Sequence, residues 1–203
     1  MPTPDQKPAD LPHLRLASAV AFYVGVLVLA AIWSMLMSAG LLPILAIPKD
    51  KTLPWWLAGV GAALAIVVVT ALAERHSPAL RRLSAELGDL VAPVTLPRVL
   101  VLAGLSGICE EALFRGPVQQ TLGLVPAALV FALLHGGLSR RYLAWSLFAL
   151  LAGLCFGVLA DVYASVAPAA IAHIVVNAIN LRRLARAQEP PPAAGQGTED
   201  ARG

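Results

Sequence analysis

The amino-acid sequence predicts an all-α membrane protein: a polytopic bundle of about six transmembrane helices, with one interfacial amphipathic helix. Of its 203 residues, 58% are hydrophobic and only 13% are charged, whereas soluble domains average roughly 45–50% and about 25%. Five stretches contain no Asp, Glu, Lys or Arg: 16–48, 52–73, 116–139, 142–160 and 162–181. Because one membrane-spanning helix needs about 20 such residues, this pattern excludes a soluble enzyme, a disordered chain and a protein whose partner is nucleic acid. The lipid bilayer is the expected surrounding.

The first third of the chain predicts a tail and two spans. Residues 1–15 are polar and proline-rich, as in an unstructured tail. The apolar stretch after them is too long for a secretory signal, so we expect an uncleaved first span over 16–38. Residues 41–48 re-enter the membrane or lie at its surface. Two tryptophans open the second span, which covers 55–73, and aromatic rings favour such interfacial positions.

Residues 77–88 predict an amphipathic helix of another kind, lying at the membrane interface. Ser77 and Pro78 form a cap and first-turn pair, and Gly88 can end the helix. A plain solvated linker is the alternative. The apolar face consists of Leu80, Leu83, Leu87 and Leu90.

Four further spans are expected in the second half of the chain. Their predicted limits are Pro97 to Gln120, Leu124 to Gly137, Tyr142 to Ala160 and Pro168 to Leu181. Within the third of these, Ala149, Gly153 and Gly157 recur every four residues, a stripe that lets membrane helices pack closely. Residues 187–203 have the composition of a disordered tail.

The basic residues predict the orientation of this bundle. If the amino terminus is cytoplasmic, twelve Lys and Arg residues lie on that side and two, Lys49 and Lys51, on the other. This positive-inside bias favours a multi-pass protein of the cell membrane with both termini in the cytoplasm. Cys109 and Cys155 fall inside apolar stretches, which indicates buried thiols rather than a disulfide framework.

Three charged side chains, Glu110, Glu111 and Arg115, lie in the third expected span, where each costs about 2.5–3.5 kcal/mol at a helix centre. Glu111 and Arg115 are four residues apart with the acid first, which favours a structural ion pair. Glu110 is rotated by about 100° from Glu111 and has no local partner. Its carboxylate can take a proton from water and return it, as general acid–base catalysis requires.

Two histidines and an asparagine also lie in apolar helices. His173 and Asn177 share one helix face, where two convergent donors can hold an oxyanion. Phe131 precedes His135 by one turn and can pack against its ring. Counted from the nearest cytoplasmic arginine, Glu110, His135 and His173 lie about 18, 8 and 13 Å deep. With tilted helices these groups can meet in one cavity open to cytosolic water.

Three motifs resemble those of the CPBP family, the CAAX-type and bacteriocin-processing intramembrane endopeptidases. EEALFR at 110–115 resembles the family's EExxxR, FALLH at 131–135 its FxxxH, and HIVVN at 173–177 its HxxxN. They occur in the family's order on three helices, within a region of resemblance over roughly 96–186. The resemblance implies a helical bundle around a cytosol-facing chamber, and endoproteolysis of a membrane-associated protein or peptide.

The resemblance also implies a role for each matched position. Glu110 and His135 would activate the attacking water, and His173 and Asn177 would stabilise the oxyanion. The supporting positions would be Glu111, Arg115 and Phe131. Zinc bound by Glu110, His135 and His173 is an alternative, but the sequence lacks HExxH and a mechanism without metal or cofactor is favoured. The substrate can be a prenylated or C-terminally anchored chain.

Three other interpretations stay open: a rhomboid protease, a transporter and a non-catalytic scaffold or immunity protein. Residues 104–107 (GLSG) fit the GxSG pattern of rhomboid proteases, with Ser106 as nucleophile, but HIVVN follows this serine, whereas the rhomboid HxxxN element precedes it. Buried Glu, Arg and His also build transport pathways, although no internal repeat is present. A non-catalytic membrane scaffold or immunity protein is the remaining alternative.

The expected domain organisation has four parts. They are a tail over 1–15, two spans with the interfacial helix over 16–95, a catalytic helical core over 96–186 and a tail over 187–203.

Overall fold

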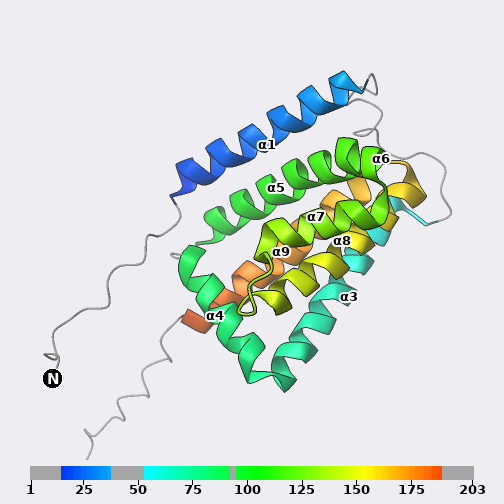
Figure 1. The fold of residues 1–203 in the computed structure, drawn as a ribbon. Coiled ribbons are helices and arrows are strands. Elements are labelled where there is room, and N and C mark those ends of the chain that lie inside the picture. The colour runs from blue at the N-terminus through cyan, green and yellow to red at the C-terminus, as the bar shows by residue number, and fades with distance from the viewer. Residues whose placement is uncertain (1–14, 38–52, 92–94, 189–203) are drawn as a thin grey trace, which may run out of the picture.

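The computed structural model describes residues 15–37, 53–91 and 95–188, in which all regular structure is helical (Figure 1). Residues 41–48 lie outside these ranges, as do the predicted tails except for residues 15, 187 and 188. The elements are α1 (Leu16–Leu36), α3 (Trp55–His76), α4 (Pro78–Val91), α5 (Leu96–Leu113), the π-helical turn η1 (Phe114–Val118), α6 (Gln119–Leu122), α7 (Leu124–Gly136), α8 (Leu143–Tyr163) and α9 (Ala167–Gln188). The predicted all-α class is confirmed.

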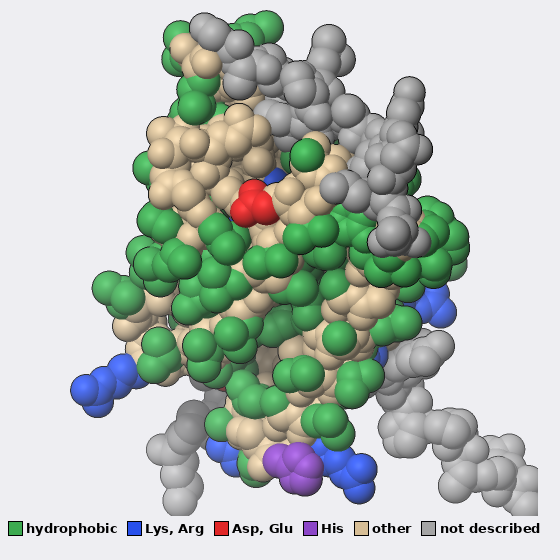
Figure 2. All heavy atoms as spheres, turned by 90° about the vertical axis from the view of Figure 1, so that its right-hand side faces the viewer, with side chains coloured by type: hydrophobic (Ala, Val, Ile, Leu, Met, Phe, Trp, Pro, Cys, Tyr) green, Lys and Arg blue, Asp and Glu red, His purple; other side chains and the backbone are tan. Residues whose placement is uncertain are grey.

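Within the described ranges, three helices, α1, α3 and α8, are long and apolar enough to cross a membrane. Large apolar side chains point outward from all three. Figure 2 shows one face of the molecule covered by apolar side chains, with basic side chains toward its lower part. The protein is therefore a membrane helical bundle, while the count of six spans and the orientation stay predictions.

Helix α5 lies at the centre of the fold. It packs against α1 on one side and against α9 on another, α9 also packs against α3, and α7 pairs with α8 (Figure 1). Two buried clusters fill the bundle. The first contains Ala30, Leu113, Phe114, Val118, Ala127, Phe131, Ala132 and Ala149. The second contains Ala63, Ala152, Phe156, Ala169, Ala172 and Val176.

Small residues bring the central helices close together. A Cβ atom added to Gly107 of α5 would lie 2.5 Å from Ile174 Cγ1 and 2.9 Å from its backbone nitrogen. A Cβ on Gly153 would lie 3.3 Å from Phe131 Cδ1, so the predicted small-residue stripe of α8 packs against α7. Gly104 has open space beside it, so of the two glycines in GLSG only Gly107 serves helix packing.

The prediction of one continuous span from Pro97 to Gln120 is wrong at its second half. Helix α5 ends at Leu113, and the π-helical turn η1 follows, with Gly116 at a non-helical ψ of −114°. Pro117 has no N–H to donate and its ring disfavours the α conformation of the residue before it. The Gly116–Pro117 pair therefore breaks the helix and sets Arg115 within a turn.

Helix α7 is short because glycines bound it on both sides. Gly123 has φ 86° and Gly137 has φ 63°, a region that side chains with a Cβ rarely adopt. The 13 residues between them span about 20 Å, against a hydrocarbon core of about 30 Å. His135 is consequently the penultimate residue of α7, one turn from the loop that leads into α8.

Helix α4 confirms the predicted amphipathic element and removes the linker alternative. The Ser77 hydroxyl accepts a hydrogen bond from the backbone N–H of Leu80 (3.3 Å), and Leu83 is buried. Gly88 was expected to end the helix, but it lies buried inside it, and the helix continues to Val91.

Side-chain contacts join α3, α4, α9 and the α7–α8 loop at one end of the bundle. Ser84 donates to Glu74 at the end of α3 (2.6 Å), and Arg183 of α9 donates to the same carboxylate (2.7 Å). Arg81 donates to the Glu74 carbonyl (2.7 Å). Glu86 pairs with Arg141 in the α7–α8 loop (2.8 Å). Helix α9 continues to Gln188, beyond the predicted limit at Leu181.

Candidate active site

The two neighbouring glutamates of α5 point to different helices. Glu111 is fully buried, with Oε2 2.8 Å from Nε of Arg115 and Oε1 2.8 Å from Nδ1 of His173 on α9. The ion pair expected from the spacing of Glu111 and Arg115 is present, and it has a third member that the sequence did not indicate. Arg115 and His173 together satisfy both oxygens of a carboxylate that no water reaches.

Arg115 extends this contact toward the far end of the bundle. Its Nη1 donates to Oε1 of Gln119 (3.1 Å), and Nε2 of Gln119 donates to Asp161 (2.7 Å) and to the Gly157 carbonyl (3.1 Å). A Cβ on Gly157 would lie 2.6 Å from Gln119 Oε1, so this glycine makes room for the amide. We call the chain of His173, Glu111, Arg115, Gln119 and Asp161 the Glu111 network. Sequence reasoning missed Gln119 and Asp161.

Glu110 faces α1 and α7 instead. Its Oε1 accepts a hydrogen bond from the Tyr23 hydroxyl (3.1 Å), and its Oε2 lies 3.5 Å from Nε2 of His135. Oε2 has no hydrogen-bond partner among the described residues. The side chains of His135 and Glu110 are 24% and 12% exposed, so this pair lies at the edge of the interior rather than within it.

The contacts of His135 determine which ring nitrogen carries its proton. Nδ1 lies 2.8 Å from the Phe131 carbonyl oxygen, and a carbonyl can only accept, so Nδ1 is the donor. Nε2 is then the ring nitrogen that faces Glu110, 3.5 Å from its Oε2. With a neutral ring and a charged carboxylate, both atoms are acceptors, and a water molecule or a shared proton that donates to both satisfies them.

Phe131 connects the two histidines, as its predicted supporting place requires. Its ring centroid lies 4.1 Å from that of His135 and 6.1 Å from that of His173. The guanidinium carbon of Arg115 lies 5.6 Å from the same ring centroid. Phe156 stacks on the other side of His173 at 5.2 Å. The imidazole rings are thus held in place by aromatic packing as well as by hydrogen bonds.

Asn177 lies one turn beyond His173 and contacts Ser106, one turn before Glu110. Its amide Nδ2 donates to Ser106 Oγ (2.8 Å), and the serine hydroxyl donates to the Ala103 carbonyl (3.2 Å). The amide therefore keeps one further N–H. In the described part of the chain, no histidine is hydrogen-bonded to Ser106.

The predicted groups therefore gather around one stretch of α5. Glu110 and His135 are in contact, and His173 lies on the other side of Phe131. The depth estimated for His135 assumed a helix as far as Arg140, whereas α7 ends at Gly136. Among the described residues, no three His, Cys, Asp or Glu side chains are grouped to hold a metal ion. Nδ1 of His173 is bonded to Glu111, which leaves Nε2 of the same ring unused. Because this bond is compatible with either mechanism, the metal-free mechanism stays a prediction.

Tyr23 is the contact residue that sequence reasoning overlooked. It lies seven residues, about 10 Å, inside the first span, whereas tyrosine favours the membrane interface. A hydroxyl so far inside a charge-free stretch was a signal that a polar partner lies nearby.

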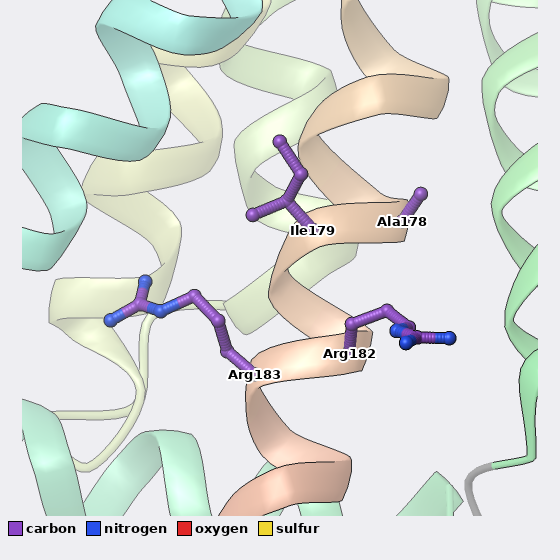
Figure 3. Close-up of a pocket in the computed structure, with 4 residues that line it drawn as sticks. All are labelled: Ala178, Ile179, Arg182 and Arg183. Carbon is purple, nitrogen blue, oxygen red and sulfur yellow. The ribbon is translucent and has the colours of Figure 1, made fainter.

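A surface pocket of about 320 Å³ opens beside the carboxyl-terminal part of α9. Figure 3 shows Ala178, Ile179, Arg182 and Arg183 lining it, with the two arginines pointing in different directions from the helix. Arg183 is held by Glu74. The pocket therefore adds basic charge near Asn177 without contacting Glu110.

Comparison with known proteins places the three motifs within one matched segment. Residues 92–179 match the family model described as type II CAAX prenyl endopeptidase Rce1-like. The segment of 88 residues that matches a curated Bacillus subtilis (strain 168) protein, named "Uncharacterized protein YpbD", is 33% identical to it. That match covers 42% of this chain and 44% of the relative, so it spans less than half of either. No solved structure matches.

Proposed function

We propose that the protein is an intramembrane endopeptidase of the glutamic type, because residues 92–179 match the family model of the type II CAAX prenyl endopeptidases, Rce1-like. It hydrolyses a peptide bond of a membrane-associated protein or peptide with water activated by Glu110 and His135. The observation that carries the proposal is the pair of facing acceptors, Glu110 Oε2 and His135 Nε2, 3.5 Å apart.

Water beside these two atoms can donate one hydrogen bond to each. As its oxygen bonds to the carbonyl carbon of the substrate, its proton passes to Glu110 or His135. When the carbon–nitrogen bond breaks, the same group returns a proton to the leaving nitrogen. Oε1 of Glu110 stays bonded to Tyr23, so only Oε2 takes part in this exchange.

His173 and Asn177 are proposed to stabilise the charge that develops on the carbonyl oxygen. Asn177 has an N–H beyond the one bonded to Ser106. His173 donates to Glu111 through Nδ1, so its Nε2 becomes a donor only when the ring is protonated. Glu111 then supplies the counter-charge and fixes the ring orientation, as the carboxylate of a Ser–His–Asp triad does.

The proposed substrate is a protein whose carboxyl terminus is prenylated or anchored in the membrane. A lipid or an apolar anchor holds such a substrate at the depth of the bilayer, where the outward faces of α1, α3 and α8 are apolar. The protein is proposed to lie in the cell membrane with both termini in the cytoplasm. No cofactor is proposed, and cleavage is expected to continue in the presence of a strong chelator.

The first prediction tests Glu110. We expect Glu110→Gln to lower the cleavage rate of a fluorogenic farnesylated CAAX peptide by about 10²–10⁴-fold, because the amide cannot accept the proton. The folded yield should stay at the wild-type level, since the side-chain volume is kept. Glu86→Gln, on the exposed side of α4, is the matched control and should cleave normally. Mass spectrometry of membrane proteins from cells with either variant would reveal fragments that depend on Glu110.

The outcomes distinguish the alternatives. Wild-type cleavage by Glu110→Gln would remove the proposal. Loss of cleavage in Ser106→Ala, with Glu110→Gln active, would favour the rhomboid type. A biological effect that survives Glu110→Gln without cleavage would favour a scaffold, and cleavage lost with chelator and restored by zinc would favour a metalloprotease.

A further inference from the structure

We propose that Tyr23 of α1 is a positioning residue for Glu110, so that α1 completes the hydrolytic site rather than serving only as a membrane anchor. This inference rests on the proposed function of Glu110. It assigns a role to a residue that lies 87 positions from Glu110 in the chain and outside all three motifs. It also lies outside the segment 92–179 that matches the family model.

The inner face of α1 presents Tyr23 to α5. Ala19, Ala30 and Ser34 are buried, and Tyr23 is half-buried on the same face. The neighbouring ring of Phe22 is 62% exposed and points outward. Tyr23 is therefore directed at α5 by the register of the helix, and its hydroxyl reaches Glu110 Oε1 at 3.1 Å.

One hydrogen bond decides which carboxylate oxygen is left for chemistry. The terminal torsion of a glutamate side chain has a broad, roughly two-fold preference, so its two oxygens can otherwise exchange places. The Tyr23 hydroxyl engages Oε1, and Oε2 is left without a hydrogen bond, 3.5 Å from His135 Nε2. A hydroxyl donor also stabilises the charged carboxylate, and this matters most where little water is present.

Docking of α1 does not depend on this hydroxyl. The helix is held by small and apolar contacts, with Ala30 in the first buried cluster and Val26 and Trp33 packed against it. Removing one oxygen atom leaves these contacts in place. Loss of the hydroxyl is therefore expected to alter the reaction and not the fold.

The test compares Tyr23→Phe with Tyr163→Phe on the farnesylated CAAX peptide. Tyr163 also donates one hydrogen bond, to the Leu53 carbonyl (3.0 Å), but it lies at the end of α8 away from Glu110. We expect Tyr23→Phe to lower kcat by about 10- to 100-fold with KM unchanged. Tyr163→Phe should keep the wild-type kcat, and both variants should keep the wild-type melting temperature.

A pH profile separates positioning from a general structural effect. The titratable groups that face or adjoin Glu110 are Tyr23 from α1, Cys109 and Glu111 from α5, His135 from α7 and His173 from α9. Without the Tyr23 donor, the acid limb of kcat/KM should move to higher pH. Tyr23→3-fluorotyrosine keeps the ring and strengthens the donor, so it should move that limb to lower pH.

The outcomes are distinguishable from failure of the proposed function. If Glu110→Gln is inactive while Tyr23→Phe keeps the wild-type kcat and pH profile, this inference is overturned and the proposed function stands. If Glu110→Gln is active, the proposed function fails and the inference fails with it. A lower melting temperature in Tyr23→Phe, with an unmoved acid limb in the fluorotyrosine variant, would show a structural role and overturn the inference.

Discussion

The two sides of α5 differ in how completely their charged groups are paired. On the α9 side, both oxygens of Glu111 are bonded within 2.8 Å and the side chain is fully buried. On the side of α1 and α7, one oxygen of Glu110 is bonded, and the other has no hydrogen bond to the part of the chain that the structure describes. A carboxylate with both oxygens bonded can hold helices together, whereas one with an unbonded oxygen can take a proton.

The difference arises from one step along a helix. Adjacent residues are rotated by about 100°, so Glu110 and Glu111 face different neighbours although their backbones are joined. The π-helical turn after Leu113 keeps Arg115 within 2.8 Å of Glu111 and away from Glu110. One short segment thus supplies both a structural charge and a reactive one.

The largest expected effect is the loss of stability when the ion pair of Glu111 on the α9 side is removed. Glu111→Ala leaves Arg115 buried without its counter-ion and His173 without its acceptor, and removal of one partner from a buried pair costs about 3–5 kcal/mol. Because whole domains are stable by only about 5–15 kcal/mol, we expect a sharp fall in folded yield and melting temperature in detergent. Arg115→Ala should act in the same direction.

The control for this prediction is Glu111→Gln, because glutamine has a side chain of the same length and keeps one acceptor oxygen. It should fold better than Glu111→Ala while leaving His173 without a charged partner, so that its cleavage rate falls more than its stability. Wild-type melting of Glu111→Ala would mean that the Glu111 network does not stabilise the bundle.

On the side of α5 that faces α1 and α7, we expect a substitution to affect folding less and the cleavage rate strongly. His135→Ala removes one of the two acceptors beside the proposed water, and general-base groups contribute about 10²–10⁴-fold. Its ring is 24% exposed, so the protein should still fold and insert. Cleavage of the farnesylated peptide and the melting temperature, measured on the same preparation, test this contrast.

His76→Ala is the matched control, because His76 lies exposed at the end of α3. It should leave both the rate and the melting temperature unchanged. If His135→Ala instead lowered stability as much as Glu111→Ala, the two sides of α5 would not differ in the way proposed.

The helices could be predicted from the sequence because their signals are local. Charge-free stretches and flanking arginines gave the ends of α1, α3 and α8 to within a few residues. The break at Gly116–Pro117 was missed because apolar side chains continue on both sides of it. Gly116 and Pro117 break the helix through their backbone geometry, and a hydropathy pattern contains no information about that geometry.

The site was only partly predictable, for a related physical reason. Contacts between residues four apart on one helix, such as Glu111 with Arg115, follow from spacing alone. Contacts between helices do not, so the bonds of His173 to Glu111 and of Tyr23 to Glu110 could not be read from the sequence. Which oxygen of Glu110 is free depends on three helices at once.

The smallest effect is expected at the far end of the Glu111 network. Gln119→Ala removes the acceptor of Arg115 Nη1 and the donors to Gly157 and Asp161, and an unsatisfied buried polar group costs about 1–3 kcal/mol. We therefore expect a moderate fall in melting temperature and a wild-type cleavage rate, because Glu111 still holds His173. Gln120→Ala, at the exposed neighbouring position, should change neither. A rate loss in Gln119→Ala without a fall in stability would mean that the network acts on the reaction as well as on the fold.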